Sequence, residues 1–213
     1  MTLARPAAAT VGTAGEGGTA ALYRADVGSL EETNAMFDRI ESELGAVQLL
    51  VTNAGIARSG DSLAMDSGIW REIMQVNLHG TFHCVWRAKT EMMESGYGRI
   101  VCLSSLLGMV VNRISAERLI AYGTSKAAII GFVRNCAAAF GPHVRVNCVA
   151  PGYVDTDMTA DVSDEARAML IEATPLKRLG QVDEIAEMVR FLLSDRSSFT
   201  TGQTHVLSGG LGM

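Results

Sequence analysis

The segment Tyr122-Gly123-Thr124-Ser125-Lys126 holds the residues best suited to proton chemistry. Its spacing places the phenol of Tyr122 and the ammonium of Lys126 one turn apart on the same face of a helix. A phenol with its ordinary pKa of about 10 is a poor base at neutral pH. A neighbouring cation lowers that pKa, so the pair predicts a tyrosine that exchanges a proton with a substrate oxygen. Taken alone, these five residues favour a half-buried tyrosine beside a solvated lysine.

The elements around this segment alternate between short apolar strands and longer helices, which is typical of a parallel α/β sheet. We expect strands at 20–25, 47–52, 99–104, 144–150 and 204–207. We expect helices at 30–44, 67–95, 122–140 and 183–193, the second broken near Asn77–Gly80. No linker or repeat separates these elements. Residues 1–213 are therefore expected to form one domain with a doubly wound sheet, in which 1–19 is loop or disordered chain.

Polar residues and glycines follow four of the expected strands. Asp26, Asn53–Gly55, Ser104–Ser105 and Pro151–Gly152 each come directly after one of them. In open parallel sheets, ligands bind beyond the carboxyl ends of the strands. The sequence therefore predicts one ligand site along this edge of the sheet.

The composition excludes several classes of protein. Of the 213 residues, 48% are hydrophobic and 19% are charged, and the formal net charge is -5. The acidic balance gives no basic face for nucleic acid. No apolar run reaches the roughly 18 residues of a membrane span, and residues 1–20 carry no signal-peptide pattern. We expect a cytoplasmic protein that binds neither nucleic acid nor membrane.

The side chains that bind metals are scattered along the chain. The four cysteines lie far apart among apolar neighbours, which predicts small buried side chains rather than zinc ligands or a redox dithiol. His79 and His83 could share one face of a helix, but no third ligand accompanies them. No metal site is predicted.

Five motifs occur in a fixed order along the chain: Thr52-Asn53-Ala54-Gly55, Val76-Asn77, Ser104-Ser105, Tyr122 with Lys126, and Pro151-Gly152-Tyr153-Val154-Asp155-Thr156. In these motifs the chain resembles the short-chain dehydrogenase/reductase family, most closely its 3-oxoacyl-(acyl carrier protein) reductase-type members. The resemblance runs from about Gly18 to the C-terminus and implies a Rossmann-like sheet. It also implies an oxidoreductase that interconverts a secondary alcohol and a ketone by hydride transfer, with NADP or NAD as the cofactor.

The resemblance assigns roles to residues of these motifs. Tyr122 would exchange the proton, Lys126 would lower the pKa of Tyr122 and bind the nicotinamide ribose, and Ser105 would bind the substrate oxygen. Asn77 would hold a water of the proton relay, unless it only fills a kink in the helix. Besides Tyr122 and Lys126, the cofactor would be lined on its adenosine side by Asp26, Val27, Asn53, Ala54 and Gly55, and on its nicotinamide side by Pro151, Gly152, Val154 and Thr156.

The chain departs from the family pattern at its start. The family opens with a strand, a T-G-x-x-x-G-x-G loop, a helix and a second strand, a unit of at least about 30 residues. Only residues 1–25 precede Asp26, and the glycine-rich run at 12–18 has no apolar strand before it. The first two family strands and the phosphate loop are therefore expected to be absent. The segments at 20–25 and 47–52 would then either pair directly or remain apart.

This departure leaves two hypotheses. The chain is an active oxidoreductase, or it is a catalytically inactive, truncated member that serves as a fragment or structural subunit. Because an open strand edge favours aggregation, we expect poor stability or activity from the chain alone. The helices at 69–95 and 121–140, through which the family forms tetramers, are retained, so a homo-oligomer (dimer or tetramer) is expected. The small carbonyl or alcohol substrate and the choice between NAD and NADP stay open.

Overall fold

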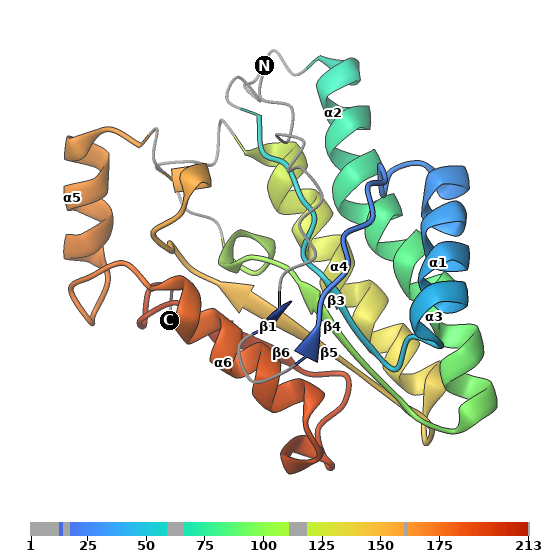
Figure 1. The fold of residues 1–213 in the computed structure, drawn as a ribbon. Coiled ribbons are helices and arrows are strands. Elements are labelled where there is room, and N and C mark those ends of the chain that lie inside the picture. The colour runs from blue at the N-terminus through green and yellow to red at the C-terminus, as the bar shows by residue number, and fades with distance from the viewer. Residues whose placement is uncertain (1–12, 15–17, 59–65, 111–118, 160–161, 213) are drawn as a thin grey trace.

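The computed structural model describes residues 13–14, 18–58, 66–110, 119–159 and 162–212. Figure 1 shows a parallel sheet with helices on both faces. Its four strands, hydrogen-bonded in chain order, are β3 (Leu49–Thr52), β4 (Gly98–Leu103), β5 (Val144–Pro151) and β6 (Thr204–Leu207). The predicted α/β fold is confirmed, and each of these strands lies within two residues of its expected position.

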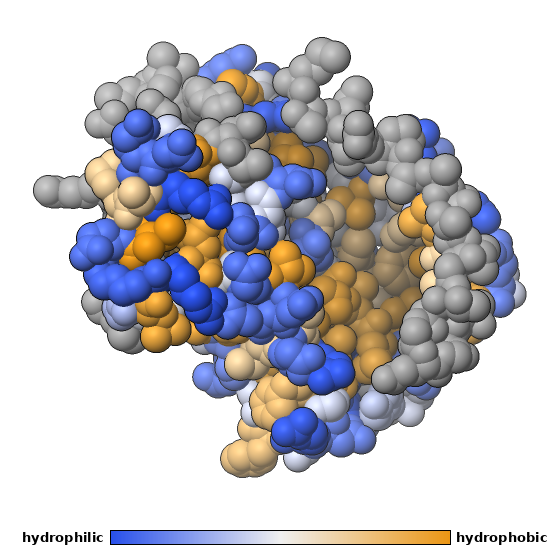
Figure 2. Space-filling view, turned by 60° about the vertical axis from the view of Figure 1, so that its left-hand side comes forward, coloured by the Kyte–Doolittle hydropathy of each residue, from blue (hydrophilic) through white to orange (hydrophobic). Residues whose placement is uncertain are grey.

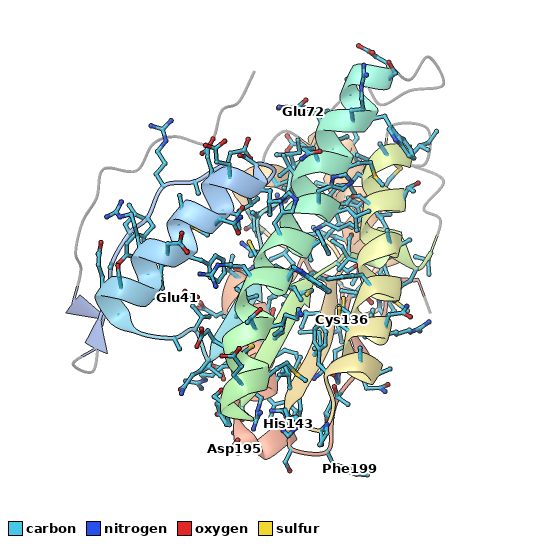
Figure 3. All side chains as sticks on the ribbon, turned by 90° about the vertical axis from the view of Figure 1, so that its right-hand side faces the viewer. Glu41, Glu72, Cys136, His143, Asp195 and Phe199 are labelled. Atoms are coloured by element: carbon cyan, nitrogen blue, oxygen red, sulfur yellow. The ribbon has the colours of Figure 1, made fainter. Side chains whose placement is uncertain are left out.

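Three helices lie side by side over one face of the sheet (Figure 3). They are α1 (Leu30–Leu44), α3 (Gly80–Ser95) and α4 (Ile120–Phe140). Phe37 of α1, Met92 of α3 and Ile129 of α4 pack against Ile100 and Val146 of the sheet in the larger apolar core. A parallel sheet needs cover on both faces, and these helices supply it on the first.

The opposite face of the sheet is covered by α6 (Val182–Leu193). Its Leu192 packs with Val101, Leu103 and Val149 in a second, smaller core. Because this core involves β4 and β5, α6 covers the middle of the sheet rather than the β3 side.

The long helix expected at 67–95 is broken at the predicted place. It consists of α2 (Ser67–Met74), a π-helical turn at Gln75–His79, and α3. The sequence analysis did not predict α5 (Asp164–Ala173), although Ser163 caps its start by accepting a hydrogen bond from the backbone of Ala166 (3.3 Å). No helix among the described residues is long and apolar enough to cross a membrane.

The strand expected at 20–25 does not form, and that prediction was wrong. The phenol of Tyr23 instead donates a hydrogen bond to Glu43 of α1 (2.7 Å), and the guanidinium of Arg39 lies 5.0 Å from the ring centroid. A strand needs a neighbour to exchange backbone hydrogen bonds with, and none of the described strands pairs with this segment. The segment and β3 therefore remain apart.

A short element lies in the region expected to be loop or disordered chain. β1 (Thr13–Ala14) and β2 (Gly18–Thr19) form an antiparallel pair, separate from the main sheet. The rest of 1–17 lies outside the described residues.

Among the described strands only β4 pairs with β3, and the other edge of β3 borders a hollow that we call the β3 trough. Its volume is about 360 Å³. It is lined by Val27, Met36, Phe37, Ile40, Val47, Leu49, Leu50, Val51, Thr52, Asn53, Ala54, Gly80, Thr81 and Cys84. Figure 2 shows hydrophobic residues lining a deep hollow in the surface. None of these lining side chains carries a formal charge.

The cysteines are buried and free, as the sequence predicted. Cys84, Cys102, Cys136 and Cys148 all contribute to the larger core, and none forms a disulfide. Burial raises the pKa of Cys102 to about 12 and that of Cys148 to about 11. Such thiols stay protonated and unreactive at neutral pH.

Candidate active site

The carboxyl ends of neighbouring strands meet at one edge of the sheet. The parallel register aligns Thr52 with Cys102, and Cys102 with Cys148. The residues that come after these three in the chain therefore lie at the same edge of the sheet. The backbone N–H of Ser104 donates to Val149 of β5 (2.8 Å), and that of Gly152 donates to Leu207 of β6 (2.8 Å). Three of the four strand ends predicted to form the ligand site therefore lie together.

Lys126 projects from α4 into this edge and is buried. Its Nζ donates a hydrogen bond to the carbonyl oxygen of Leu103 (2.8 Å), at the end of β4. Burial lowers the pKa of Lys126 to about 8. A Cβ on Gly55 would lie 3.4 Å from this Nζ and 3.4 Å from Oδ1 of Asn77, so the three residues meet closely.

Tyr122 lies one helical turn before Lys126, whose Nζ is 5.7 Å from the centroid of the phenol ring. Burial raises the pKa of Tyr122, a hydrogen bond with Ser105 opposes the rise, and the neighbouring Tyr153 adds to it. The expected lowering of this pKa by Lys126 is not found, because desolvation dominates and the ammonium is directed to Leu103. The phenol therefore holds its proton at neutral pH.

The two serines after β4 have different positions. The hydroxyl of Ser104 donates to the backbone oxygen of Lys126 (2.7 Å) and so ties the strand to α4. Ser105 accepts a hydrogen bond from the backbone of Leu107 (3.2 Å) and also hydrogen-bonds to Tyr122. The geometry thus places Ser105, rather than Ser104, beside the phenol.

Asn77 sits fully buried in the π-helical turn. Its Oδ1 accepts from the backbone N–H of Ile56 (2.8 Å), and its Nδ2 donates to the carbonyl of Ile56 (3.0 Å) and to Oγ of Ser125 (3.0 Å). Its own carbonyl accepts a hydrogen bond from Thr81 (2.8 Å). Asn77 therefore joins the segment after β3 to α4, next to Tyr122 and Lys126.

Asn77→Ala is expected to lower the free energy of unfolding by about 3 kcal/mol, since each buried group left without a partner costs about 1–3 kcal/mol. Urea denaturation measures this difference. Asn135→Ala is the matched control, because Asn135 is exposed and makes one hydrogen bond, to Gly131 of α4 (2.9 Å). Equal losses in the two variants would contradict a bridging role for Asn77.

Three of the five residues predicted for the adenosine side line the β3 trough. Val27, Asn53 and Ala54 all line it. Val27 is fixed by its carbonyl, which accepts a hydrogen bond from Nδ1 of His83 (2.9 Å). The carboxylate of Asp26 accepts from the backbone of Gly28 (2.8 Å) and so shapes the turn before α1.

The residues predicted for the nicotinamide side follow β5. Pro151 aligns with Leu207 at the end of the sheet. A Cβ on Gly152 would lie 2.8 Å from Cα of Ser208, so only glycine fits this close approach. Tyr153 interacts electrostatically with Tyr122, so this segment lies beside the catalytic candidates.

Hydrogen bonds of Thr159 hold the loop beyond Tyr153 in place. Val154 forms an isolated parallel bridge with Gly180. The hydroxyl of Thr159 donates to the carbonyl of Val154 (2.7 Å) and accepts from the backbone N–H of Thr156 (3.1 Å). Thr156 is thereby held at an exposed turn after the strand.

The sequence analysis missed three contributors to this site: the carbonyl of Leu103, the hydroxyl of Ser125 and the phenol of Tyr153. Ser125 links Asn77 to the carbonyl of Tyr122, to which it donates a hydrogen bond (2.7 Å). The available signal in the sequence was a serine directly before Lys126, inside the segment from Tyr122 to Lys126. Nothing in the sequence pattern marks a backbone carbonyl as a lysine partner.

Metal chemistry has no support in the described part of the chain. Within it, no group of three or more His, Cys, Asp or Glu side chains could hold a metal ion. The rings of His79 and His83 are 6.4 Å apart at an angle of 69°, and His83 is engaged with Val27.

The family model described as enoyl-(acyl carrier protein) reductase matches residues 2–212. The chain belongs to this short-chain dehydrogenase/reductase family. The 3-oxoacyl-[acyl-carrier-protein] reductase of Staphylococcus aureus is 36% identical over 191 residues, which are 89% of this chain and 76% of the relative. The resemblance found in the sequence is confirmed, and the family makes this short-chain dehydrogenase/reductase an oxidoreductase.

Solved structures of similar sequence share the fold. A gluconate 5-dehydrogenase from Burkholderia cenocepacia, in complex with NADP and tartrate, has a TM-score of 0.82 and 30% identity, covering 87% of this chain and 72% of its own. A 3-oxoacyl-[acyl-carrier protein] reductase from Brucella melitensis with bound NAD has a TM-score of 0.79 and 35% identity, covering 88% and 70%. This short-chain dehydrogenase/reductase therefore has relatives solved with each of the two cofactors.

Proposed function

We propose that this short-chain dehydrogenase/reductase interconverts a small ketone and its secondary alcohol, with NADP or NAD as the cofactor. The observation that carries the proposal is the cluster of Asn77, Ser105, Tyr122 and Lys126 at the carboxyl edge of the sheet. When bound, the nicotinamide supplies or accepts the hydride. The residues of the chain supply orientation and the proton.

Tyr122 and Ser105 act on the substrate oxygen. The Ser105 hydroxyl lies within hydrogen-bonding reach of the phenol, so an oxygen bound between them contacts both groups. Because the pKa of Tyr122 is raised, the phenol keeps its proton until the oxygen becomes basic enough to take it. In the reverse direction the substrate hydroxyl returns the proton to Tyr122.

Lys126 binds and orients the cofactor ribose. An ammonium has three N–H donors, so the hydrogen bond to Leu103 leaves others for ribose hydroxyls. Gly55 allows a close approach here, since a Cβ would crowd both Lys126 and Asn77 at 3.4 Å. The remaining N–H donors of Lys126 and the absence of a side chain at Gly55 fit a bound nucleoside better than a packed core.

The remaining predicted residues fit the two ends of the cofactor. Val27, Asn53 and Ala54 offer an uncharged, partly apolar surface for the adenosine end, and Asp26 fixes the turn that presents Val27. Pro151, Gly152, Val154 and Thr156 would border the nicotinamide end, where Thr159 holds the backbone of Thr156 in place.

The test is a titration of the purified 213-residue chain with NADPH and NADH, followed by fluorescence and by melting temperature. Saturable binding with a raised melting temperature is expected, and ketone reduction is then measured. Gly55→Val is expected to block binding, because its side chain projects toward Lys126 and Asn77. Binding of neither cofactor would leave the structural subunit as the better account.

We also propose that the protein is a cytoplasmic homo-oligomer, assembled through α3 and α4. Phe82 and Trp86 of α3 are 40% and 51% exposed and stack with ring centroids 5.6 Å apart. Phe132 of α4 adds an edge-to-face contact at 6.2 Å. Exposed apolar clusters of this kind mark interaction sites, and free buried thiols suit a reducing compartment.

Trp86→Glu is expected to weaken self-association at least about tenfold, because a charge would be buried at the interface. Sedimentation velocity over a range of concentrations measures the effect. Phe199→Glu is the control, since Phe199 is fully exposed at the far end of the sheet (Figure 3). A dimer or tetramer that persists unchanged in Trp86→Glu would place the interface elsewhere.

A further inference from the structure

The chain between β5 and α6 leaves the sheet through a closed neck. Val154 forms a parallel bridge with Gly180. The backbone N–H of Asp155 donates to the carbonyl of Gly180 (2.9 Å), and the N–H of Gly180 donates to the carbonyl of Tyr153 (3.0 Å). We call residues 156–159 and 162–179, which lie between the two sides of this neck, the α5 flap. Because the neck holds both ends of the flap together, α5 can change its angle to the sheet without moving Tyr153.

The C-terminal end of the α5 flap is fixed to the body of the protein. The backbone N–H of Leu176 donates to the carbonyl of Gly209 (3.1 Å), which follows β6. Arg178 forms an ion pair with Glu184 of α6 (2.6 Å). A Cβ on Gly209 would lie 2.9 Å from the methyl group of Thr174, so the chain after α5 packs tightly here. These contacts anchor the end of α5 and leave the direction of its first half to be set by something else.

The first half of α5 has few contacts that fix its direction. Of the ten residues of α5, only Leu170 is buried. Figure 1 shows the helix standing apart from the sheet, beyond the end of β5. Among the described residues, one ion pair joins its first two turns to residues outside the flap: Nη2 of Arg167 lies 2.9 Å from Oδ1 of Asp155. A helix of this length is marginal in water by itself, so this ion pair has a large share in deciding where the helix lies.

Asp155 connects the α5 flap directly to the candidate site. It lies between Val154 and Thr156, two residues of the segment proposed above to border the nicotinamide end of the cofactor. Because the hydride passes between the nicotinamide and the substrate carbonyl, the ketone binds at this same end. The ion pair of Asp155 with Arg167 therefore sets the distance between α5 and the bound ketone.

The strength of this ion pair suits a helix that has to open and close. The side chains of Arg167 and Asp155 are 35% and 49% exposed. An ion pair with this exposure shifts an equilibrium by at most about fivefold. The pair therefore favours one position of α5 without locking it, so that the substrate can enter and the product can leave.

We propose that Arg167 is a positioning residue, whose ion pair with Asp155 holds α5 at the nicotinamide end of the site, where the helix closes over the ketone. The pair sets the affinity for the ketone and leaves the chemical step to Ser105, Tyr122 and Lys126. This role rests on the proposed oxidoreductase function. The position of α5 does not rest on it and is measured separately.

Arg167→Gln is expected to raise KM about two- to fivefold for ethyl acetoacetate, a small ketone used as the probe. The kcat is expected to stay within about twofold, because the proton-exchanging residues are untouched. The Kd for NADPH is expected to stay within about twofold, because Thr159 holds the backbone of Thr156 without α5. Arg190→Gln is the matched control, since Arg190 forms an exposed ion pair with Glu187 within α6 (2.7 Å).

Reversal of the two charges separates a specific contact from a general disturbance. Asp155→Arg and Arg167→Asp each place like charges together, and each is expected to raise KM at least about fivefold. The double variant carries both changes and again has opposite charges at these positions. Its KM is expected to return to within about twofold of the native value.

Hydrogen exchange measures the position of α5 without cofactor or substrate. In Arg167→Gln the backbone amides of α5 are expected to exchange about two- to fivefold faster than in the native protein, and the amide of Gly180 in the neck at the native rate. The double variant is expected to restore the native rates. If the native chain reduces no ketone, the oxidoreductase proposal fails, and this comparison alone decides whether the ion pair positions α5.

Three results would overturn the proposal. The first is an unchanged KM in Arg167→Gln, and the second is a raised KM that the double variant does not lower. The third is exchange that becomes faster at Gly180 as much as in α5, which would indicate a general loss of stability rather than the release of one helix.

Discussion

Replacing Tyr122 with phenylalanine is expected to lower kcat/KM for carbonyl reduction by about 100- to 10,000-fold, the usual contribution of a positioned proton donor. The pKa of Tyr122 is raised by burial, so the native phenol carries its proton throughout the neutral range. Phenylalanine keeps the ring that packs beside Lys126 and loses only the hydroxyl. Initial rates with NADPH and NADH measure the effect.

The stability of Tyr122→Phe should change little, because one hydrogen bond, to Ser105, is lost. Its expected cost is about 1 kcal/mol. Tyr97→Phe is the control, since Tyr97 precedes β4 at the opposite end of the sheet from the site. An unchanged kcat/KM in Tyr122→Phe would remove the proton-donor role.

Replacing Lys126 with methionine is expected to change how stability depends on pH. Burial lowers the pKa of Lys126 from 10.5 to about 8. Between these values the unfolded chain binds more protons than the folded chain, so Lys126 makes stability rise with pH. The rise is about 3 kcal/mol, from about 1.36 kcal/mol per pKa unit. Below pH 8 the native protein carries a buried charge, and this stabilisation is absent.

At pH 7, Lys126→Met should therefore be as stable as the native protein or more stable. Methionine relieves the desolvation of the ammonium but leaves the Leu103 carbonyl without its partner, which costs about 1–3 kcal/mol. At pH 10.5 the native protein should have gained about 3 kcal/mol relative to the variant. The buried thiols of Cys102 and Cys148 oppose this trend in both proteins, so they largely cancel in the difference.

Urea denaturation of both proteins at pH 7 and pH 10.5 gives this difference directly. Lys177→Met, at an exposed lysine that pairs with Glu172, is the charge-matched control. If the difference between native protein and Lys126→Met were the same at both values of pH, Lys126 would not be desolvated as its burial indicates.

The sequence was sufficient to predict most elements because their signals are local. The strand at 144–150 is rich in valine and is followed by Pro151 and Gly152. The helix expected at 122–140 is followed by Gly141, and α4 ends at Phe140, directly before it. The break near Asn77 was also expected and is the π-helical turn. The segment at 20–25 was misread because strand formation depends on a neighbour, which the local pattern does not encode.

The composition of the candidate site was also accessible from the sequence. Ordered motifs after successive strands must meet, because parallel strands end at one edge of a sheet. The strand-end argument covered Ser105, whereas the resemblance to the family grouped it with Asn77, Tyr122 and Lys126. The structure brings these four residues into a connected cluster with Ser125.

By itself, the sequence determined the α/β class, the positions of the four main strands along the chain and the family of this protein. Only the tertiary structure decided that the pKa of Tyr122 is raised, and that Ser104 is hydrogen-bonded to α4 while Ser105 is hydrogen-bonded to the phenol. It also decided that the edge of β3 with which no described strand pairs borders an apolar trough. The reason is physical: periodicity and spacing are properties of neighbouring residues, whereas desolvation and hydrogen-bond partners come from residues brought together across the fold.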